Sequence, residues 1–170
     1  MWYFNQQKKF EGIAVVRRGM ISPASLVDFV RESNRIERIL HDPTPTEIQA
    51  HVDFLATRPT IESLKQFVGA VQPDARIRDH EGLDVAVGRY LPPRGGPEIA
   101  SALEAILFDL SDPFLAHQRY EALHPFTDGN GRSGRVLWLW TMGGINRVPL
   151  GFLHHWYYQS LQFYCQVPVW

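Results

Sequence analysis

Residues 124–135, His-Pro-Phe-Thr-Asp-Gly-Asn-Gly-Arg-Ser-Gly-Arg, constrain the fold of this chain more than any other stretch. They are followed directly by an apolar run, residues 136–140. The glycines favour a loop, and the apolar run favours a helix that begins near Gly131. The first main-chain N–H groups of such a helix have no helical acceptor and point back at the loop. The stretch therefore predicts an anion-binding site at a helix N-terminus.

The polar side chains of this stretch are suited to phosphate chemistry. Arg132 and Arg135 are three residues apart, so on a helix they lie one turn apart and can reach the same polyanion. Asp128 would repel a bound phosphate unless a cation lay between them, which predicts Mg²⁺. His124 has the chemistry of a general base. These residues together predict a nucleotide-phosphate site with a histidine beside it.

The stretch resembles the signature loop of the Fic family, H-P-F-x-D/E-G-N-G-R-x-x-R, and matches every fixed position. The resemblance implies an all-α helical bundle with a small β-hairpin flap over the active site, and a single Fic domain over residues 1–170. It implies that His124 is the catalytic base and that Asp128 is the Mg²⁺ ligand. The nucleotide-binding residues that it implies in this stretch are Asp128, Gly129, Asn130, Gly131, Arg132, Ser133, Gly134 and Arg135.

The activity implied by the resemblance is adenylyl transfer, in which AMP passes from ATP to a Ser, Thr or Tyr hydroxyl of a target protein. ATP and this target, which can be the chain itself, are the expected partners, and Mg²⁺ is the expected cofactor. Three alternatives stay open: removal of AMP from a modified protein, transfer of the γ-phosphate, and a nucleotide-binding module without turnover. The intact Arg132 and Arg135 argue against γ-phosphate transfer. The intact His124 and Asp128 argue against loss of chemistry.

Residues 22–40 predict an amphipathic helix that carries a candidate inhibitory motif. Ser33 and Glu37 are four residues apart and share one face of this helix. Taken alone, Glu37 is typical of a solvated carboxylate. However, Ser33-x-x-x-Glu37 resembles the inhibitory motif S/T-x-x-x-E-G/N of Fic proteins, which implies that Glu37 pairs with Arg135 and displaces the γ-phosphate of ATP. Arg38 stands where that motif has Gly or Asn.

Residues 75–91 predict a β-hairpin with its turn near Glu81-Gly82, because apolar and polar residues alternate after that turn. An ordinary surface hairpin that packs on helices is the alternative, since an isolated hairpin is only marginally stable. The resemblance instead implies the Fic flap, which holds a target segment by main-chain pairing. The flap residues that it places at the border of the nucleotide are Val87, Gly88, Arg89 and Tyr90.

The other periodic segments predict further helices, at 44–56, 60–68, 97–110, 114–123 and 151–165. The last of these carries Tyr157 and Tyr158, which resemble the paired tyrosines that Fic proteins hold near the adenine. Two core aromatics on an apolar helix are an equally good interpretation.

Composition excludes several function classes. The formal net charge is −1, from 17 basic and 18 acidic residues, which predicts neither a nucleic-acid nor a membrane partner. Cys165 is the single cysteine and fits a reducing compartment. The N-terminus lacks the apolar core of a signal peptide, and no apolar run approaches the length of a membrane span. We therefore expect a cytoplasmic protein. These patterns specify neither its target nor its oligomeric state.

Overall fold

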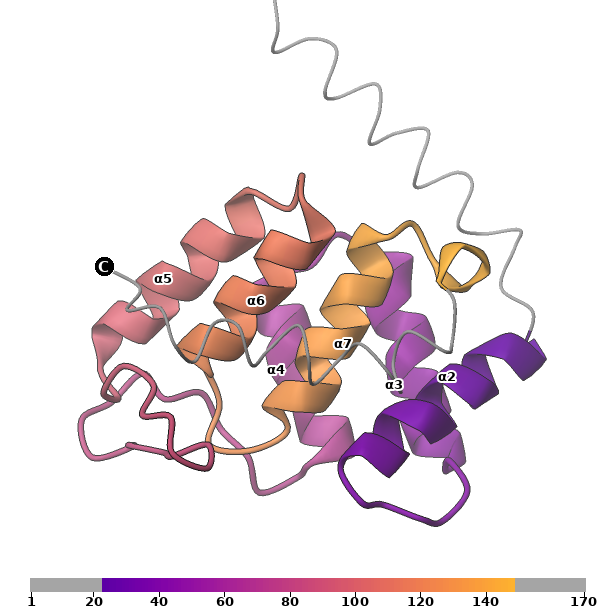
Figure 1. Cartoon of the computed structure of the whole chain (residues 1–170), viewed down its shortest axis with the longest axis horizontal. Helices are drawn as coiled ribbons and strands as arrows, with labels where there is room; N and C mark the ends of the chain where they lie inside the picture. The colour runs from indigo at the N-terminus through magenta and orange to yellow at the C-terminus, as the bar shows by residue number, and fades with distance from the viewer. Residues whose placement is uncertain (1–22, 149–170) are drawn as a thin grey trace, which may run out of the picture.

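Helix α7 (Asn130–Thr141) forms the centre of the fold in the computed structural model, which describes residues 23–148. Every residue from 132 to 140 is buried, so the helix is enclosed on all sides. The helices that pack around it are α2 (Pro23–Ile36), α3 (Pro45–Ala56), α4 (Ile61–Val71) and α6 (Pro113–Leu123). Figure 1 shows α7 between α6 and α3.

Two further elements complete the described part of the chain. Helix α5 (Pro97–Phe108) packs against α6 and α4, and the short 3₁₀ helix η1 (Ile145–Arg147) packs against α2. Residues 23–148 contain six α-helices and no β-strand, which confirms the predicted all-α fold. None of these helices is long and apolar enough to cross a bilayer.

Side-chain caps explain where three of the helices begin. Thr44 and Thr60 each accept a hydrogen bond from the main-chain N–H three residues later and form capping boxes at the starts of α3 and α4. Asp112 accepts hydrogen bonds from two N–H groups at the start of α6. A cap of this kind contributes about 1 kcal/mol. These starts agree with the predicted ones, whereas α4 continues through Gly69, where the sequence predicted its end.

Helix α2 ends at Ile36, before the predicted end at residue 40. Arg38 has a φ of 61°, in the left-handed region. Its N–H donates to the Arg35 carbonyl at 3.0 Å, and the Ile39 N–H donates to the Asn34 carbonyl at 3.0 Å. This pair of hydrogen bonds is a Schellman motif, which usually has Gly or Asn at the left-handed position. The motif leaves Glu37 at the end of the helix rather than within it.

A buried carboxylate fastens the end of α2 to α3. Glu47 is 6% exposed and accepts hydrogen bonds from Asn34 Nδ2 at 2.9 Å and from the Thr44 N–H at 2.7 Å. Burial raises the pKa of the Glu47 carboxyl, but the hydrogen bonds from Thr44 and Asn34 outweigh it and lower the pKa overall. The carboxylate is therefore ionised and holds α2 in place a few residues before Glu37.

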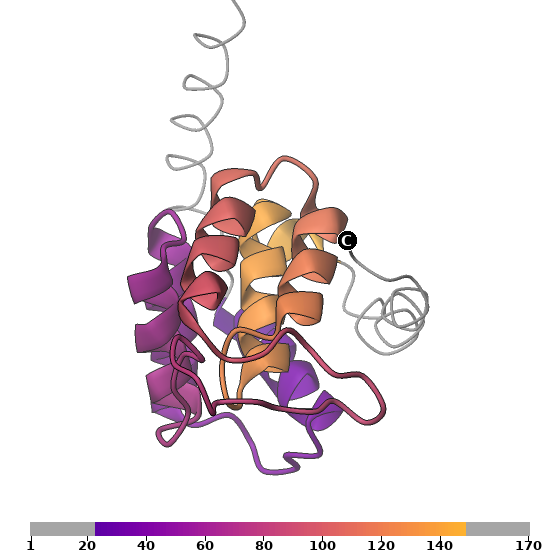
Figure 2. The ribbon, with the colours of Figure 1, turned by 90° about the vertical axis from the view of Figure 1, so that its left-hand side faces the viewer.

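The long α4–α5 connection, residues 72–96, runs along the end of the bundle where α6 ends and α7 begins (Figures 1 and 2). This arrangement brings residues from three parts of the chain to one end of the molecule. The connection thereby forms one side of the candidate site.

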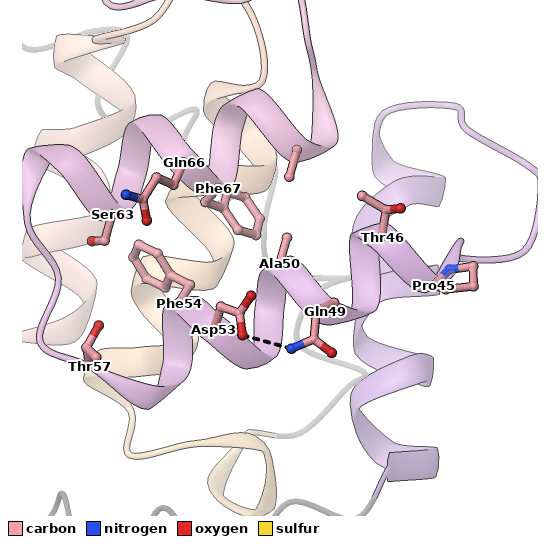
Figure 3. A pocket seen from close by; sticks show the side chains of 11 residues that line it. Pro45, Thr46, Gln49, Ala50, Asp53, Phe54, Thr57, Ser63, Gln66 and Phe67 are labelled. Atoms are coloured by element: carbon pink, nitrogen blue, oxygen red, sulfur yellow. Dashed lines mark hydrogen bonds between the residues drawn. The ribbon is translucent and has the colours of Figure 1, made fainter.

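A separate groove of about 640 Å³ lies between α3 and α4 (Figure 3). Phe54 and Phe67 line it, and a hydrogen bond of 2.8 Å joins Gln49 Nε2 to Asp53 Oδ1 at its edge. Asp53 is the only charged residue among those that line it. The groove shares no lining residue with the cleft at residues 124–135.

Candidate active site

His124 lies at the C-terminal end of α6 in a left-handed conformation, with φ 51° and ψ 61°. This conformation costs a non-glycine residue roughly 1–2 kcal/mol. Two hydrogen bonds to the main chain of His124 hold it: the His124 N–H donates to the Tyr120 carbonyl at 2.9 Å, and the side-chain Nε of Arg78 donates to the His124 carbonyl at 2.7 Å. The imidazole hydrogen-bonds the main chain of Glu121. One ring nitrogen is thus engaged, and the other can accept a proton.

Burial lowers the pKa of His124 to about 4. The positive charge of Arg78 also lowers it, while the hydrogen bond to Glu121 and the charges of Glu37 and Asp128 oppose the shift. The imidazole is therefore neutral at pH 7, which is the form that a general base requires.

Residues 125–127 pair with residues 76–78 of the α4–α5 connection. Arg78 N–H donates to the Pro125 carbonyl at 2.8 Å, and Thr127 N–H donates to the Arg76 carbonyl at 2.9 Å. Phe126, between them, is 1% exposed and anchors the loop in the core. This pairing fixes the loop relative to the connection.

Asn130 closes the loop with both ends of its side-chain amide. Its Oδ1 accepts from the Phe126 N–H at 2.8 Å, and its Nδ2 donates to the Phe126 carbonyl at 2.8 Å. The side chain is therefore engaged within the loop, and what Asn130 offers a ligand is its main-chain N–H. The first main-chain hydrogen bond of α7 joins the Ser133 N–H to the Gly129 carbonyl at 3.0 Å. The N–H groups of residues 130–132 precede it and have no helical acceptor.

Ser133 and Gly134 face α6. Ser133 Oγ donates to the Gly129 carbonyl at 2.9 Å and hydrogen-bonds the Tyr120 hydroxyl at 2.6 Å. A Cβ on Gly134 would overlap the Glu121 carboxylate, so the absence of a side chain there lets α6 and α7 approach closely. Neither residue lines the cleft described below.

A glutamine links Asp128 to Arg132. Gln72 Nε2 donates to Asp128 Oδ2 at 2.8 Å, and Arg132 Nη2 donates to Gln72 Oε1 at 2.6 Å. The other Asp128 oxygen, Oδ1, accepts from the Gly129 N–H at 2.6 Å. Arg132 Nη1 donates to the Val71 carbonyl at 2.7 Å. The expected metal ligand and one expected phosphate-binding arginine are therefore joined through a single amide.

Glu37 reaches the start of α7 and pairs with Arg135. Arg135 Nη2 donates to Glu37 Oε1 at 2.5 Å, and its Nε donates to Ser33 Oγ at 2.8 Å. Arg135 is fully buried, whereas the Glu37 side chain is 38% exposed. A Cβ on Gly131 would overlap Glu37 Oε1, so the carboxylate lies directly against the first turn of α7. This is the expected pairing of Glu37 with Arg135.

One cleft of about 600 Å³ collects these groups. Its lining residues are Glu37, Ile39, Gln72, Val85, Ala86, Val87, Gly88, His124, Thr127, Asp128, Gly129, Asn130, Gly131 and Arg132. Arg89 and Tyr90 are not among these residues. The cleft thus joins the histidine, the aspartate, the helix N-terminus and the α2 carboxylate.

The hairpin predicted over residues 75–91 does not form as a strand ladder in the described residues. The predicted turn is present, with Gly82 at a φ of 82°, but the segments on either side of it do not pair. The first segment is engaged elsewhere: besides its bonds to residues 125–127, its Arg78 carbonyl accepts from the Gly96 N–H at 2.9 Å. The second segment folds on itself, and two hydrogen bonds between Val87 and Tyr90, of 2.9 and 3.0 Å, close a tight turn.

The remaining predicted site residues are placed as follows. The Tyr90 hydroxyl donates to the Ala122 carbonyl of α6 at 2.8 Å, and Arg89 is exposed. Tyr157 and Tyr158, with the predicted helix 151–165, lie outside the described residues.

The carboxylate at Asp128 fits the Mg²⁺ that the family resemblance implies. Asp128 is exposed, and its oxygens are the type of ligand that Mg²⁺ prefers. Residues 23–148 contain no group of three His, Cys, Asp or Glu side chains arranged to hold a metal ion. A single carboxylate suits an ion whose other ligands are water and substrate phosphates.

The sequence did not identify Gln72 and Arg78, whose side chains hold other site residues, nor the cleft-lining residues Ile39, Val85, Ala86 and Thr127. Gln72 ends α4 and Arg78 lies in the α4–α5 connection, and neither belongs to a motif. The one signal in the sequence is the position of Arg78 next to the apolar Ile77, before the predicted turn.

Comparison with known families agrees with this geometry. Residues 58–142, half of the 170-residue chain, match the Fic/DOC family. The protein therefore belongs to the Fic/DOC family. The match spans α4 to α7, whereas Glu37 and the rest of α2 precede it. Proteins of this family are generally enzymes that transfer a nucleotide or another group and bind nucleotides and protein targets.

Proposed function

We propose that the protein is an adenylyltransferase that moves AMP from ATP to a Ser, Thr or Tyr hydroxyl of a target protein. The observation that carries this proposal is the position of Glu37. Its carboxylate lies against Gly131 at the start of α7 and pairs with Arg135, in a cleft that also contains His124. An anionic side chain thus occupies a site suited to a phosphate group.

In the proposed reaction, His124 accepts the proton of the target hydroxyl. The hydroxyl oxygen forms a bond to the α-phosphorus, and the bond from that phosphorus to the oxygen bridging to the β-phosphate breaks. Pyrophosphate leaves with the electron pair. A neutral imidazole is needed for the first step, and the lowered pKa of His124 supplies it at pH 7.

Polyphosphate binding falls to the start of α7. The N–H groups of residues 130–132, with Arg132 and Arg135, would hold the phosphate oxygens. Asp128 would hold Mg²⁺, which when bound neutralises charge on those oxygens. Gln72 would have to release Asp128 and Arg132 for both to reach the ligand, since its amide engages both side chains.

Glu37 acts as an inhibitor in this proposal. The guanidinium of Arg135 is fully buried and donates to Glu37, so a γ-phosphate must displace the carboxylate to reach Arg135. One arginine cannot fully satisfy both anions. Removal of the carboxylate should therefore raise adenylyl transfer.

The target segment would lie along residues 85–88, which line the cleft beside His124. Main-chain hydrogen bonds to a target segment tolerate many sequences, so the target can be another protein or a second copy of this chain.

Removal of AMP from a modified protein is the second candidate. Glu37 lines the same cleft as His124 and Asp128, where its carboxylate can align a water molecule for attack on a bound phosphodiester. In that reaction Glu37 would be required rather than inhibitory.

The test is incubation with Mg²⁺ and ATP labelled at either the α or the γ position, with cell lysate as the source of targets. The proteins are wild type, Glu37→Gly, Glu37→Gln and His124→Ala. Glu32→Gln is the matched control, because Glu32 lies on the same helix but pairs with Arg35 instead of Arg135.

We expect α label in protein, more of it with either Glu37 variant, an unchanged amount with Glu32→Gln, and none with His124→Ala. Incorporation of γ label alone would overturn adenylyl transfer in favour of phosphate transfer. Labelled protein is then incubated with wild type and Glu37→Gln without ATP. Glu37-dependent release of AMP would support the second candidate.

A further inference from the structure

Arg78 is a fully buried cation, and within residues 23–148 its side chain donates hydrogen bonds only to main-chain carbonyl oxygens. Its Nε donates to His124 at 2.7 Å and its Nη2 donates to Leu123 at 2.8 Å. Its Nη1 donates to Pro93 at 2.8 Å and to Leu83 at 3.3 Å. Burial lowers the pKa of the Arg78 guanidinium, and the charge of the Asp84 carboxylate opposes this shift. A buried charge is costly unless its donors are satisfied, and here the four carbonyl oxygens accept all the hydrogen bonds of the guanidinium described above.

Two of these carbonyls belong to the end of α6, where the last four carbonyls of a helix have no helical donor. Here each of these four carbonyls accepts a hydrogen bond from a side chain. The donor to the Glu121 carbonyl is the His124 imidazole, and the donor to the Ala122 carbonyl is the Tyr90 hydroxyl. The Arg78 guanidinium donates to the carbonyls of Leu123 and His124. The helix end that presents His124 is therefore held by donors that come from the α4–α5 connection and from His124 itself.

The other two carbonyls, those of Leu83 and Pro93, lie on either side of residues 85–88, which line the cleft. One guanidinium thus joins the backbone of His124 to both ends of the segment that faces it. A shift of either part relative to the other would break hydrogen bonds of Arg78.

We propose that Arg78 is the positioning residue of this site. Its guanidinium fixes the orientation of His124 and holds residues 85–88 in place on the opposite side of the cleft. This inference rests on the proposed role of His124 as a base. The Tyr90 hydroxyl donates to the Ala122 carbonyl and thereby helps to hold the end of α6 that carries His124.

The charge of Arg78 has a second effect, on the protonation of His124. Burial and Arg78 lower the pKa of His124, and the charged groups that oppose them are Glu37 and Asp128. Arg78→Met removes both the fork and the charge. Arg78→Lys keeps a cation but cannot reproduce a planar fork with several fixed donors. Comparison of the two variants separates the effect of Arg78 on the orientation of His124 from the effect of its charge on the pKa of His124.

The experiment measures steady-state α-label transfer in the Glu37→Gly background, together with the His124 pKa by NMR titration of the imidazole signals, assigned with His124→Ala. We expect Arg78→Lys to lower kcat about 100-fold, the scale of a misplaced catalytic group, with KM for ATP changed less than about twofold. Its His124 pKa stays low. Arg78→Met loses kcat as well, and its His124 pKa moves up toward 6.5.

Tyr90→Phe removes a single hydroxyl and keeps the test decisive if Arg78→Met fails to fold; it should lower kcat about tenfold at unchanged KM. Arg94→Lys is the matched control, because Arg94 is exposed in the same connection, and it should behave as the parent. Full kcat in Arg78→Lys would overturn the proposal. So would an equal loss in Arg94→Lys.

The titration needs no turnover and therefore separates this proposal from the proposed function. If the Glu37→Gly parent transfers no α label, adenylyl transfer fails. In that case, an unchanged His124 pKa and unchanged imidazole chemical shifts in both Arg78 variants would overturn the positioning role as well.

Discussion

Glu37 Oε1 lies 2.5 Å from Arg135 Nη2, and this contact joins residues 98 positions apart in the sequence. The contact closes the end of α2 onto the first turns of α7, where the N–H groups of residues 130–132 converge. A carboxylate and a phosphate compete for this position, which makes ligand binding the most direct measure of the contact.

Replacement of Glu37 by Gln should increase the stabilisation of the protein by ATP and Mg²⁺. The neutral amide still fills the space but competes only weakly with the phosphate of ATP for Arg135. ATP should therefore bind more tightly to the folded protein and stabilise it more. We expect the rise in melting temperature at saturating ATP to be larger in Glu37→Gln than in wild type, measured by scanning fluorimetry. Equal shifts in the two proteins would contradict the competition.

The stability of the protein should fall as pH is lowered from 6.5 toward 4. Burial lowers the pKa of His51, His117 and His124 to about 4, from an ordinary value of 6.5. Because the folded pKa lies below the unfolded one, the unfolded state binds more protons in this window. The stabilisation is complete above pH 6.5 and is lost as pH falls, by on the order of 3 kcal/mol per histidine.

Urea unfolding at pH 7.5 and at pH 5 measures this effect. His51→Gln should reduce the pH dependence, since His51 is 1% exposed. A free energy of unfolding that does not change between the two pH values would refute the assignment of neutral buried histidines.

Arg38→Gly should stabilise the protein by about 1 kcal/mol, because glycine adopts the left-handed conformation at the end of α2 without the steric cost that arginine incurs. Arg35→Gly is the matched control. It lies within the last turn of α2, where the same substitution should destabilise by about 1 kcal/mol. Urea unfolding should therefore give opposite signs for the two variants. The same sign for both would rule out this explanation.

Asn130→Ala should destabilise the protein by about 2 kcal/mol and disorder residues 124–129. The change leaves the buried N–H and carbonyl of Phe126 without the hydrogen bonds that the amide supplies. Unfolding measurements give the free energy, and hydrogen exchange of the Phe126 amide reports the loop. Retained protection at Phe126 in Asn130→Ala would contradict the role of the amide.

The helices and the signature loop were predictable because their signals are local. Thr44, Thr60 and Asp112 mark helix starts by chemistry that acts over three residues. The loop at 124–135 combines glycines and polar groups in fixed order, and the start of α7 agrees with the prediction. The pairing of Glu37 with Arg135 followed from a motif that brings together two such local segments.

Other features depend on contacts between distant segments and gave no local signal. Alternation at 83–87 predicted a strand, but the possible partner at 76–78 pairs with residues 125–127 instead. The end of α2 depended on a left-handed Arg38, which local propensity disfavours. Gln72 and Arg78 gain their roles only when α4, α6 and α7 meet, so composition and periodicity could not single them out.

The capped end of α6 also has an electrostatic consequence for the cleft. The aligned peptide dipoles of α6 place partial negative charge at its C-terminus, next to a site that would receive several phosphate groups. The guanidinium of Arg78 lies on two of the carbonyls that carry this charge and neutralises it. Helix α7 starts at the same loop and presents the positive end of its own dipole. Because Arg78 offsets the negative end of α6, an anion bound at the start of α7 is attracted by the dipole of α7 and repelled less by that of α6.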